Sequence, residues 1–414
     1  MKLNIFPGWW QVVVAIVVQA ISSASIFLSY SVIAVQLKET FNPSTMVLML
    51  SVTLAIISGG VLGPLVGSAI DRLSIRRLML TGSILVTCGF FLLSITTAMW
   101  QVLAIYMLVL AIGGSLIGQI STTALLARWF TRRRGLAMGI AVSGVAIGGI
   151  IIPPLLQFLI DTFEWRMALR VFACILFSIT APSILLLVID RPSDRGLYPE
   201  GDKTPPEIET TPANSSIKSI IRSAPFWVVC IAIGTAFFGP FALISNMVPY
   251  TINNGFDARK GALLLSIYSG ASFTGKLLYA AVGDRIDNRV TFVTILSILM
   301  VSMLLFIFGD SYANLVIACV LTGISSGAAL PLRSVFIANM YGSVSLGRIL
   351  GLVGLVTMPF TLIGPPLFGW SFDVTGSYNT VLTGYLVLLV CVTLLLLRTP
   401  LKPAQQKEEK IQTS

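Results

Sequence analysis

The chain has 414 residues, of which 56% are hydrophobic and only 11% are charged. A water-soluble globular domain carries roughly twice that share of charge, so the composition excludes one and predicts a membrane protein. The net charge of +10 does not indicate a nucleic-acid partner, because the basic residues gather on one side of the predicted membrane topology.

Apolar stretches long enough to cross a membrane as helices, about 20 residues each, recur along the whole chain. The first is too long for a cleavable signal peptide and lacks a small-residue cleavage site, so we expect it to remain as the first span. The pattern predicts an all-α membrane protein with twelve transmembrane helices near residues 9–36, 45–70, 78–98, 101–125, 135–160, 167–189, 224–250, 260–282, 289–308, 313–339, 349–371 and 377–397.

The distribution of basic residues predicts the orientation of these helices. If both termini are cytoplasmic, 20 of the 27 Lys and Arg residues lie on that side, including the run Arg132–Arg134 and the tail after Arg398. This asymmetry follows the positive-inside rule. We therefore expect a multi-pass protein of the plasma membrane, the inner membrane in a bacterium, with both termini cytoplasmic.

Metal and disulfide chemistry find no support in the residues. The chain has no His, which removes imidazole as a metal ligand or proton relay. The cysteines lie on different predicted spans and are expected to be small core residues, so we expect no cofactor and no disulfide. They are Cys88, Cys174, Cys230, Cys319 and Cys391.

The two halves of the chain resemble each other at an offset of about 212 residues, as Pro153-Pro154 and Pro365-Pro366 illustrate. This repeat predicts two pseudo-symmetric six-helix bundles, residues 1–190 and 224–398. A polar cytoplasmic linker, residues 191–223, joins them, and a cytoplasmic tail, residues 399–414, follows. Parallel halves of this kind place a substrate site at their interface near the membrane midplane.

Acidic–basic pairs recur at equivalent cytoplasmic positions, Asp71-Arg72 after the second span and Asp284-Arg285 after the eighth. A carboxylate near a helix N-terminus, beside a guanidinium, can hold neighbouring helices together in one state. Solvated pairs that only set the topology are the alternative. The repetition in both halves favours a gating role for these four residues.

The repeated Asp-Arg loops resemble the cytoplasmic motif of the major facilitator superfamily. More narrowly, the chain resembles the monocarboxylate transporter family and its microbial oxalate/formate antiporter-like relatives. Four stretches carry the likeness: Gly8-Trp9-Trp10, the run from Trp129 to Gly139, the linker from Pro192 to Asp202, and residues 351–378. Trp129 stands where the animal members usually have Tyr.

The resemblance implies the major facilitator fold and transport of small mono- or dicarboxylates by alternating access. It places the family's helix-eight arginine, which pairs with the substrate carboxylate, at Lys276. The family's aspartate four residues earlier corresponds to Ser272, and the helix-one lysine of proton-coupled members falls near Tyr30-Ser31, so both family residues are absent here.

Lys276 and Arg333 are the two charges that fall deep inside predicted spans, away from the first few residues at either end, and both are positive. Lys276 stands eight residues before Asp284, about 12 Å inward along a helix. Arg333 lies about six to nine residues before the end of its predicted span, so we expect a similar depth. No acidic residue falls inside a predicted span, and an intramembrane charge without a partner indicates a functional site.

Alternatives remain for both cations, since Lys276 can extend towards the interface and Arg333 can bind helix-end carbonyls. Further polar residues in the predicted spans are candidates for substrate contact, although such side chains often bond another helix or their own backbone. Among them Ser272 lies one turn from Lys276 on the same helix face. The candidates are Tyr30, Ser31, Gln119, Asn246, Tyr268 and Ser272.

The sequence favours anion exchange over proton-coupled symport, because symport usually employs an intramembrane carboxylate or His. An efflux pump for hydrophobic drugs ranks lower, since a cationic cargo would be expected to need a carboxylate in the cavity. A non-transporting receptor has no signalling domain to support it. A membrane enzyme lacks candidate catalytic residues. The expected partners are a small carboxylate, the lipid bilayer and, for symport, protons; we expect a monomer.

Overall fold

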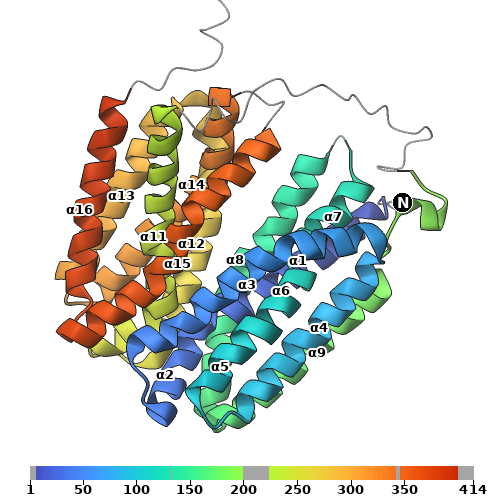
Figure 1. The fold of residues 1–414 in the computed structure, drawn as a ribbon, viewed down its shortest axis with the longest axis horizontal. Coiled ribbons are helices and arrows are strands. Elements are labelled where there is room, and N and C mark those ends of the chain that lie inside the picture. The colour runs from blue at the N-terminus through green and yellow to red at the C-terminus, as the bar shows by residue number, and fades with distance from the viewer. Residues whose placement is uncertain (1–5, 132, 199–222, 342–345, 400–414) are drawn as a thin grey trace, which may run out of the picture. The chain divides into compact units, whose positions relative to one another are not determined.

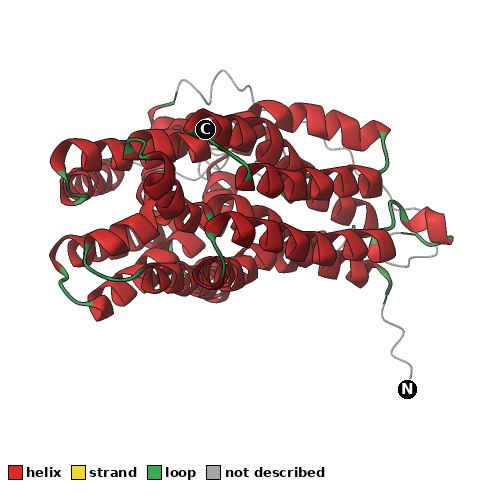
Figure 2. Cartoon of the chain, turned by 90° about the horizontal axis from the view of Figure 1, so that it is seen from below, coloured by secondary structure: helices red, strands yellow, loops and turns green. Residues whose placement is uncertain are grey.

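The computed structural model describes residues 6–131, 133–198, 223–341 and 346–399. This part of the chain is helical throughout, with short connections and no strand, as Figure 2 shows. The all-α prediction is therefore confirmed.

Each predicted span coincides with one helix or with consecutive helical segments. The largest disagreement is at the end of the first span, predicted at residue 36 and found at Phe41. The helices of the first half are α1 Gly8–Ser23, α2 Tyr30–Phe41, α3 Thr45–Arg72, α4 Ile75–Ser94, α5 Met99–Ile105, α6 Ala111–Ile117, α7 Gln119–Trp129, α8 Arg134–Thr162 and α9 Trp165–Leu187. Those of the second half are α11 Ala224–Asn253, α12 Ala258–Val282, α13 Asn288–Phe308, α14 Tyr312–Tyr341, α15 Leu346–Thr375 and α16 Asn379–Arg398 (Figure 1).

Eleven of the spans in the described residues are long and apolar enough to cross a membrane on length and composition. The twelfth predicted span, α12, is not among them. Its sequence is interrupted by Ser266, Ser269, Ser272, Thr274 and Lys276. A spanning helix with this many polar groups must place them against protein or water, because lipid cannot satisfy them.

The chain divides into two compact units. Unit 1 comprises Met1–Ile208 with Ser245–Ser269, and unit 2 comprises Glu209–Ile244 with Gly270–Ser414. The end of α11 and the beginning of α12 thus belong to unit 1, while the remainder of both helices belongs to unit 2. The domain boundaries predicted from the sequence stay a prediction.

Within unit 1, α1 and α8 approach each other most closely at two glycines. A Cβ added at Gly144 would overlap the carbonyl oxygen of Ile16, and one added at Gly148 would overlap that of Ala20. Small residues four apart let two membrane helices pack backbone to backbone. These two glycines therefore set the close packing of α1 against α8.

The internal repeat has a structural counterpart where α4 and α13 begin. In unit 1 the Arg76 guanidinium donates to the carbonyl of Leu185 at the end of α9. In unit 2 the Arg289 guanidinium donates to the carbonyl of Leu397 at the end of α16. Each arginine donates to a carbonyl in the last turn of another helix, where no backbone N–H follows to pair with it. Each arginine therefore joins two helices of its own unit.

Candidate functional site

The core of the candidate site is the crossing of α12 and α14 in unit 2. A Cβ added at Gly275 would overlap the Ile324 carbonyl oxygen, and one added at Gly327 would overlap the Ser272 carbonyl oxygen. Because α13 reverses the chain between them, α12 and α14 run in the same direction. Gly275 meets the residue three positions before Gly327, and Gly327 meets the residue three positions before Gly275. This symmetry places the two glycines at the same level along the two helices.

This crossing fixes the relative positions of the two cations. Lys276 is one residue past Gly275, and Arg333 is six residues past Gly327. At 1.5 Å per residue, Arg333 lies about 7.5 Å further along the helices than Lys276. This offset corresponds to about one and a half helical turns along the helix axes. The similar depth of the two cations in the membrane, expected from the sequence, stays a prediction.

The rotation of the helices turns both cations to one flank of the pair. A helix turns about 100° per residue, so Lys276 lies about 100° from the Gly275 contact and Arg333 about 240° from the Gly327 contact. The two contact directions point towards each other and so differ by about 180°. Rotations of about 100° and 240° in the same sense therefore end within about 40° of each other, on the same side of the helix pair. The remaining faces of α12 carry exposed Phe273 and Leu277.

Lys276 and Arg333 are half-buried. Within the described part of the chain, neither side chain has a hydrogen bond or an ion pair. The Nε atom of Arg333 is buried and has no hydrogen-bond partner there. Two cations without a described partner on one flank of a helix pair present positive potential that a carboxylate could neutralise.

The structure brings one further candidate to this flank. Ser272 is half-buried on α12, one turn before Lys276. The other candidates, Tyr30, Ser31, Gln119, Asn246 and Tyr268, belong to unit 1. Asn246 is buried on α11 and Tyr268 is half-buried on α12.

The contacts of Tyr30 and Ser31 show what these two candidates do in the structure. The Tyr30 hydroxyl donates to the Leu48 carbonyl, and its ring packs edge-on against Tyr106 with the centroids 5.0 Å apart. The Ser31 hydroxyl accepts the Val248 backbone N–H at 2.8 Å. Each of these hydroxyls therefore contributes to helix packing, which was the alternative reading from the sequence.

Gln119 is exposed at the first residue of α7, where the fourth span is interrupted. The interruption falls at Gly118, whose ψ of −148° is not helical. The sequence reading missed this break and the residues beside it: Gln19 donates to the Thr122 hydroxyl at 3.0 Å, and Ser22 donates to the Gly114 carbonyl at 3.2 Å. Polar residues in α1 and several glycines in the fourth span were the available signals.

The predicted gate residues are only partly described. The side chains of Asp71 and Asp284 lie outside the described residues. Arg72 and Arg285 are exposed and have no contact among the described residues. The gating role of these four residues stays a prediction, whereas the neighbouring Arg76 and Arg289 serve to join helices.

A pocket of about 550 Å³ lies beside Arg76 rather than beside Lys276. Arg77, Asp190 and Asp194 contribute to its lining. Asp190 accepts the Arg76 backbone N–H at 2.8 Å, so these polar groups close the joint between the start of α4 and the end of α9. The pocket is distinct from the flank that carries the two cations.

The helices described above, most of them long and apolar and arranged with an internal repeat, are those of a polytopic membrane protein. The model of the Major Facilitator Superfamily matches residues 15–262 and 241–414. The chain belongs to this superfamily, as its Asp-Arg loops predicted.

Relatives with related sequences are named as transporters. Monocarboxylate transporter 13 of Rattus norvegicus is 27% identical over 383 residues, covering 90% of this chain and 84% of the relative. Monocarboxylate transporter 11 of Homo sapiens is 28% identical over 340 residues, covering 78% and 69%. Agnestins efflux protein AgnL12 of Paecilomyces divaricatus is 25% identical over 338 residues, covering 81% and 74%. The resemblance to monocarboxylate transporters is thereby confirmed.

A solved structure agrees with this fold. A bacterial homologue of the human lysosomal transporter Spinster, solved in an inward-facing and unoccupied conformation, superposes with a TM-score of 0.66. The match covers 94% of this chain and 95% of that chain at 13% identity. At this identity the likeness concerns the fold alone.

Proposed function

We propose that this protein is a secondary transporter of small organic anions, mono- or dicarboxylates, in which Lys276 and Arg333 neutralise the substrate. The observation that carries the proposal is the pair of half-buried cations on one flank of α12 and α14, without a described counter-charge. The names of the mammalian relatives support a carboxylate as the class of cargo.

The two cations have different chemistry. The guanidinium of Arg333 remains charged and presents a planar fork that matches a carboxylate. Lys276 supplies a compact charge on a flexible stem, and the hydroxyl of Ser272 is one turn away on the same helix. Arg333 therefore orients the substrate, Lys276 neutralises it, and Ser272 adds a neutral hydrogen bond.

Anion exchange is the favoured mode of transport. The sequence has no His, and the acidic residues of the described transmembrane helices lie in the last turn of those helices. A proton-coupled symporter usually places such a group within the membrane. Anion exchange requires only that the transporter reorients when an anion is bound. Without an anion, Lys276 and Arg333 are not neutralised and the transporter does not reorient.

The decisive experiment is counterflow into proteoliposomes preloaded with lactate, pyruvate, formate, oxalate or succinate. Lys276→Gln and Arg333→Gln should each lower the apparent affinity about 10- to 100-fold, the range expected for losing a charged hydrogen bond. Lys260→Gln is the matched control, since it removes the same charge from the first turn of the same helix, away from the flank that carries the two cations, and should transport normally.

Retention of full transport by both variants would remove the site assignment. Uptake that depends on internal anion supports exchange, whereas uptake driven by an inward proton gradient alone supports symport. Efflux of hydrophobic compounds is the second candidate, favoured by the name of the fungal relative. It predicts efflux that survives loss of both cations.

The positive-inside distribution supports a plasma-membrane location with cytoplasmic termini. Protease protection of tagged termini in sealed vesicles tests that orientation.

A further inference from the structure

The segment Ser245–Ser269 forms a helical hairpin that packs within unit 1; we call it the α11–α12 hairpin. Its turn contains Gly255, whose φ of 82° favours glycine. The hairpin is continuous in sequence with the rest of α11 and α12, which belong to unit 2. Because α11 and α12 continue from one unit into the other, a movement of one unit would pull on the hairpin.

Specific polar contacts hold the hairpin to the other helices of unit 1. The Ser266 hydroxyl on α12 donates to the Ile150 carbonyl on α8 at 2.8 Å. The Val248 N–H on α11 donates to Ser31 on α2 at 2.8 Å. Close to these, Gly149 leaves no room for a Cβ beside the Ser269 side chain. These contacts are short and directional, and each costs little to break if water replaces the partner.

An ion pair lies at the outer end of this contact. The Arg259 Nε atom, at the start of α12, lies 2.5 Å from the Asp161 carboxylate at the end of α8. The other carboxylate oxygen of Asp161 accepts a hydrogen bond from the buried Gln157 side chain at 2.9 Å. The contact with Asp161 raises the pKa of the Arg259 guanidinium, and the Arg259 side chain is 73% exposed.

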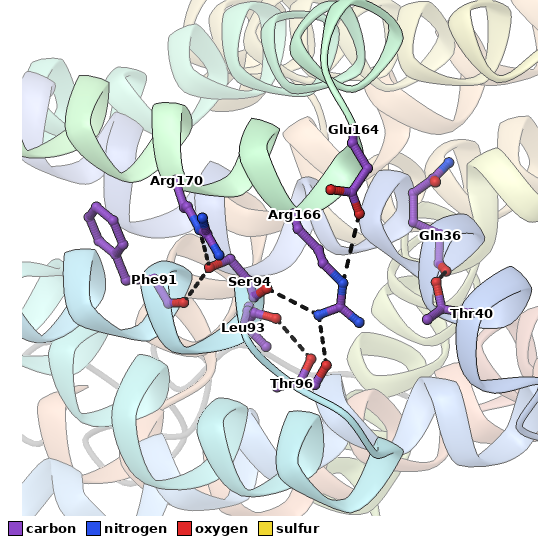
Figure 3. Close-up of polar contacts among 9 residues, drawn as sticks. All are labelled: Gln36, Thr40, Phe91, Leu93, Ser94, Thr96, Glu164, Arg166 and Arg170. Atoms are coloured by element: carbon purple, nitrogen blue, oxygen red, sulfur yellow. Dashed lines mark hydrogen bonds and ion pairs between the residues drawn. The ribbon is translucent and has the colours of Figure 1, made fainter.

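A second ion pair at the same rim has a different connection. Arg166 lies 3.8 Å from Glu164 and donates to the carbonyls of Ser94 at 3.1 Å and Thr96 at 2.7 Å. Figure 3 shows this arginine joining the start of α9 to the end of α4. Among the described residues, the hydrogen bonds and the ion pair of Arg166 join α9 to α4 and the residues beside them, and none of them reaches the hairpin.

We propose that Asp161 and Arg259, with Gln157 orienting the carboxylate, form a reversible latch that holds the α11–α12 hairpin on α8 and must open once in each transport cycle. The proposal rests on the proposed function, because alternating access requires the substrate path to open in turn on each side. An exposed ion pair suits such a latch, since it adds little stability and therefore little barrier.

The test is hydrogen–deuterium exchange, measured by mass spectrometry in nanodiscs, of peptides that cover Ser245–Ser269. Asp161→Asn should raise exchange in these peptides about two- to fivefold, the range for an exposed pair. The double variant Asp161→Arg with Arg259→Asp should return exchange towards the wild-type value. Glu164→Gln, which removes the carboxylate of the rim pair that does not touch the hairpin, should leave these peptides unchanged.

The dependence of hairpin exchange on ionic strength gives a second measurement, which tests the ion pair in the wild-type protein itself. At about 1 M salt the screening length falls to about 3 Å, so exposed charge pairs weaken. Hairpin exchange in the wild-type protein should rise with salt, and exchange in Asp161→Asn should not. Unchanged exchange in Asp161→Asn, or a charge swap that fails to restore protection, would overturn the latch.

The latch and the proposed function can fail separately. Hairpin exchange requires no substrate, so a latch that behaves as expected in a protein that moves no carboxylate would refute only the choice of cargo. Normal carboxylate counterflow with a hairpin indifferent to Asp161 would refute only the latch.

Discussion

The crossing of α12 and α14 gives the sharpest test of the site geometry, and Gly327→Ala is the perturbation. A Cβ at this position would overlap the Ser272 carbonyl oxygen and lie 2.8 Å from its carbon and 2.9 Å from its Cα. Side chains essentially never approach a backbone this closely. The substitution therefore forces the two helices apart.

The magnitude follows from that overlap. Relieving it requires a separation of about 1 Å, and overpacking of this kind typically costs about 1–3 kcal/mol of unfolding free energy. The same displacement shifts Lys276 relative to Arg333, and a misplacement of about 1 Å can reduce function about 100-fold. Transport should thus fall further than stability alone would explain.

The assay compares unfolding and carboxylate counterflow for Gly327→Ala and for Gly384→Ala. Gly384, on α16, has no atom within 4 Å of an added Cβ, so its substitution should preserve both properties. We expect a lower unfolding midpoint and slower counterflow for Gly327→Ala alone. Wild-type stability and wild-type transport in Gly327→Ala would refute the close crossing and, with it, the placement of the two cations.

Three further substitutions test contacts within single units. Arg289→Met should cost about 1 kcal/mol by leaving the Leu397 carbonyl unpaired, measured by thermal unfolding, and an unchanged midpoint would contradict the joint between α13 and α16. Tyr385→Phe removes a buried hydrogen bond of 2.8 Å to the Thr235 carbonyl and should cost a similar amount in chemical unfolding. Gly148→Val should prevent folding, read as loss of monodisperse protein in size-exclusion chromatography, because α8 has no space for a side chain against α1.

The helices were predictable because lipid imposes one rule on every span. A chain that crosses hydrocarbon must satisfy its backbone internally, so each apolar stretch of sufficient length becomes a helix. Even α12, with Lys276 and several hydroxyls, was identified as an apolar stretch of sufficient length. Its polarity also identified it as the span that cannot be surrounded by lipid.

The role of the basic residues was harder to predict. The sequence associated the Asp71-Arg72 and Asp284-Arg285 pairs with a gate, but the nearby Arg76 and Arg289 bind carbonyls at the ends of neighbouring helices in the structure. A sequence repeat indicates that two equivalent residues share a role, but it does not indicate which role. The partner of a long flexible side chain depends on which helix end lies within its reach.

The sequence by itself determined the number and extent of the membrane helices, the asymmetry of charge, the superfamily and the presence of two isolated cations. The superfamily follows from the resemblance of motifs to a known family. The other properties depend on composition, period and spacing along one chain, so they need no knowledge of which helices meet. Only the tertiary structure decided that Lys276 and Arg333 share a flank, offset along the helix axes, and that Asp161 meets Arg259 across almost a hundred intervening residues. Such relations depend on how glycines let helices cross, and a crossing is set by two sequences together.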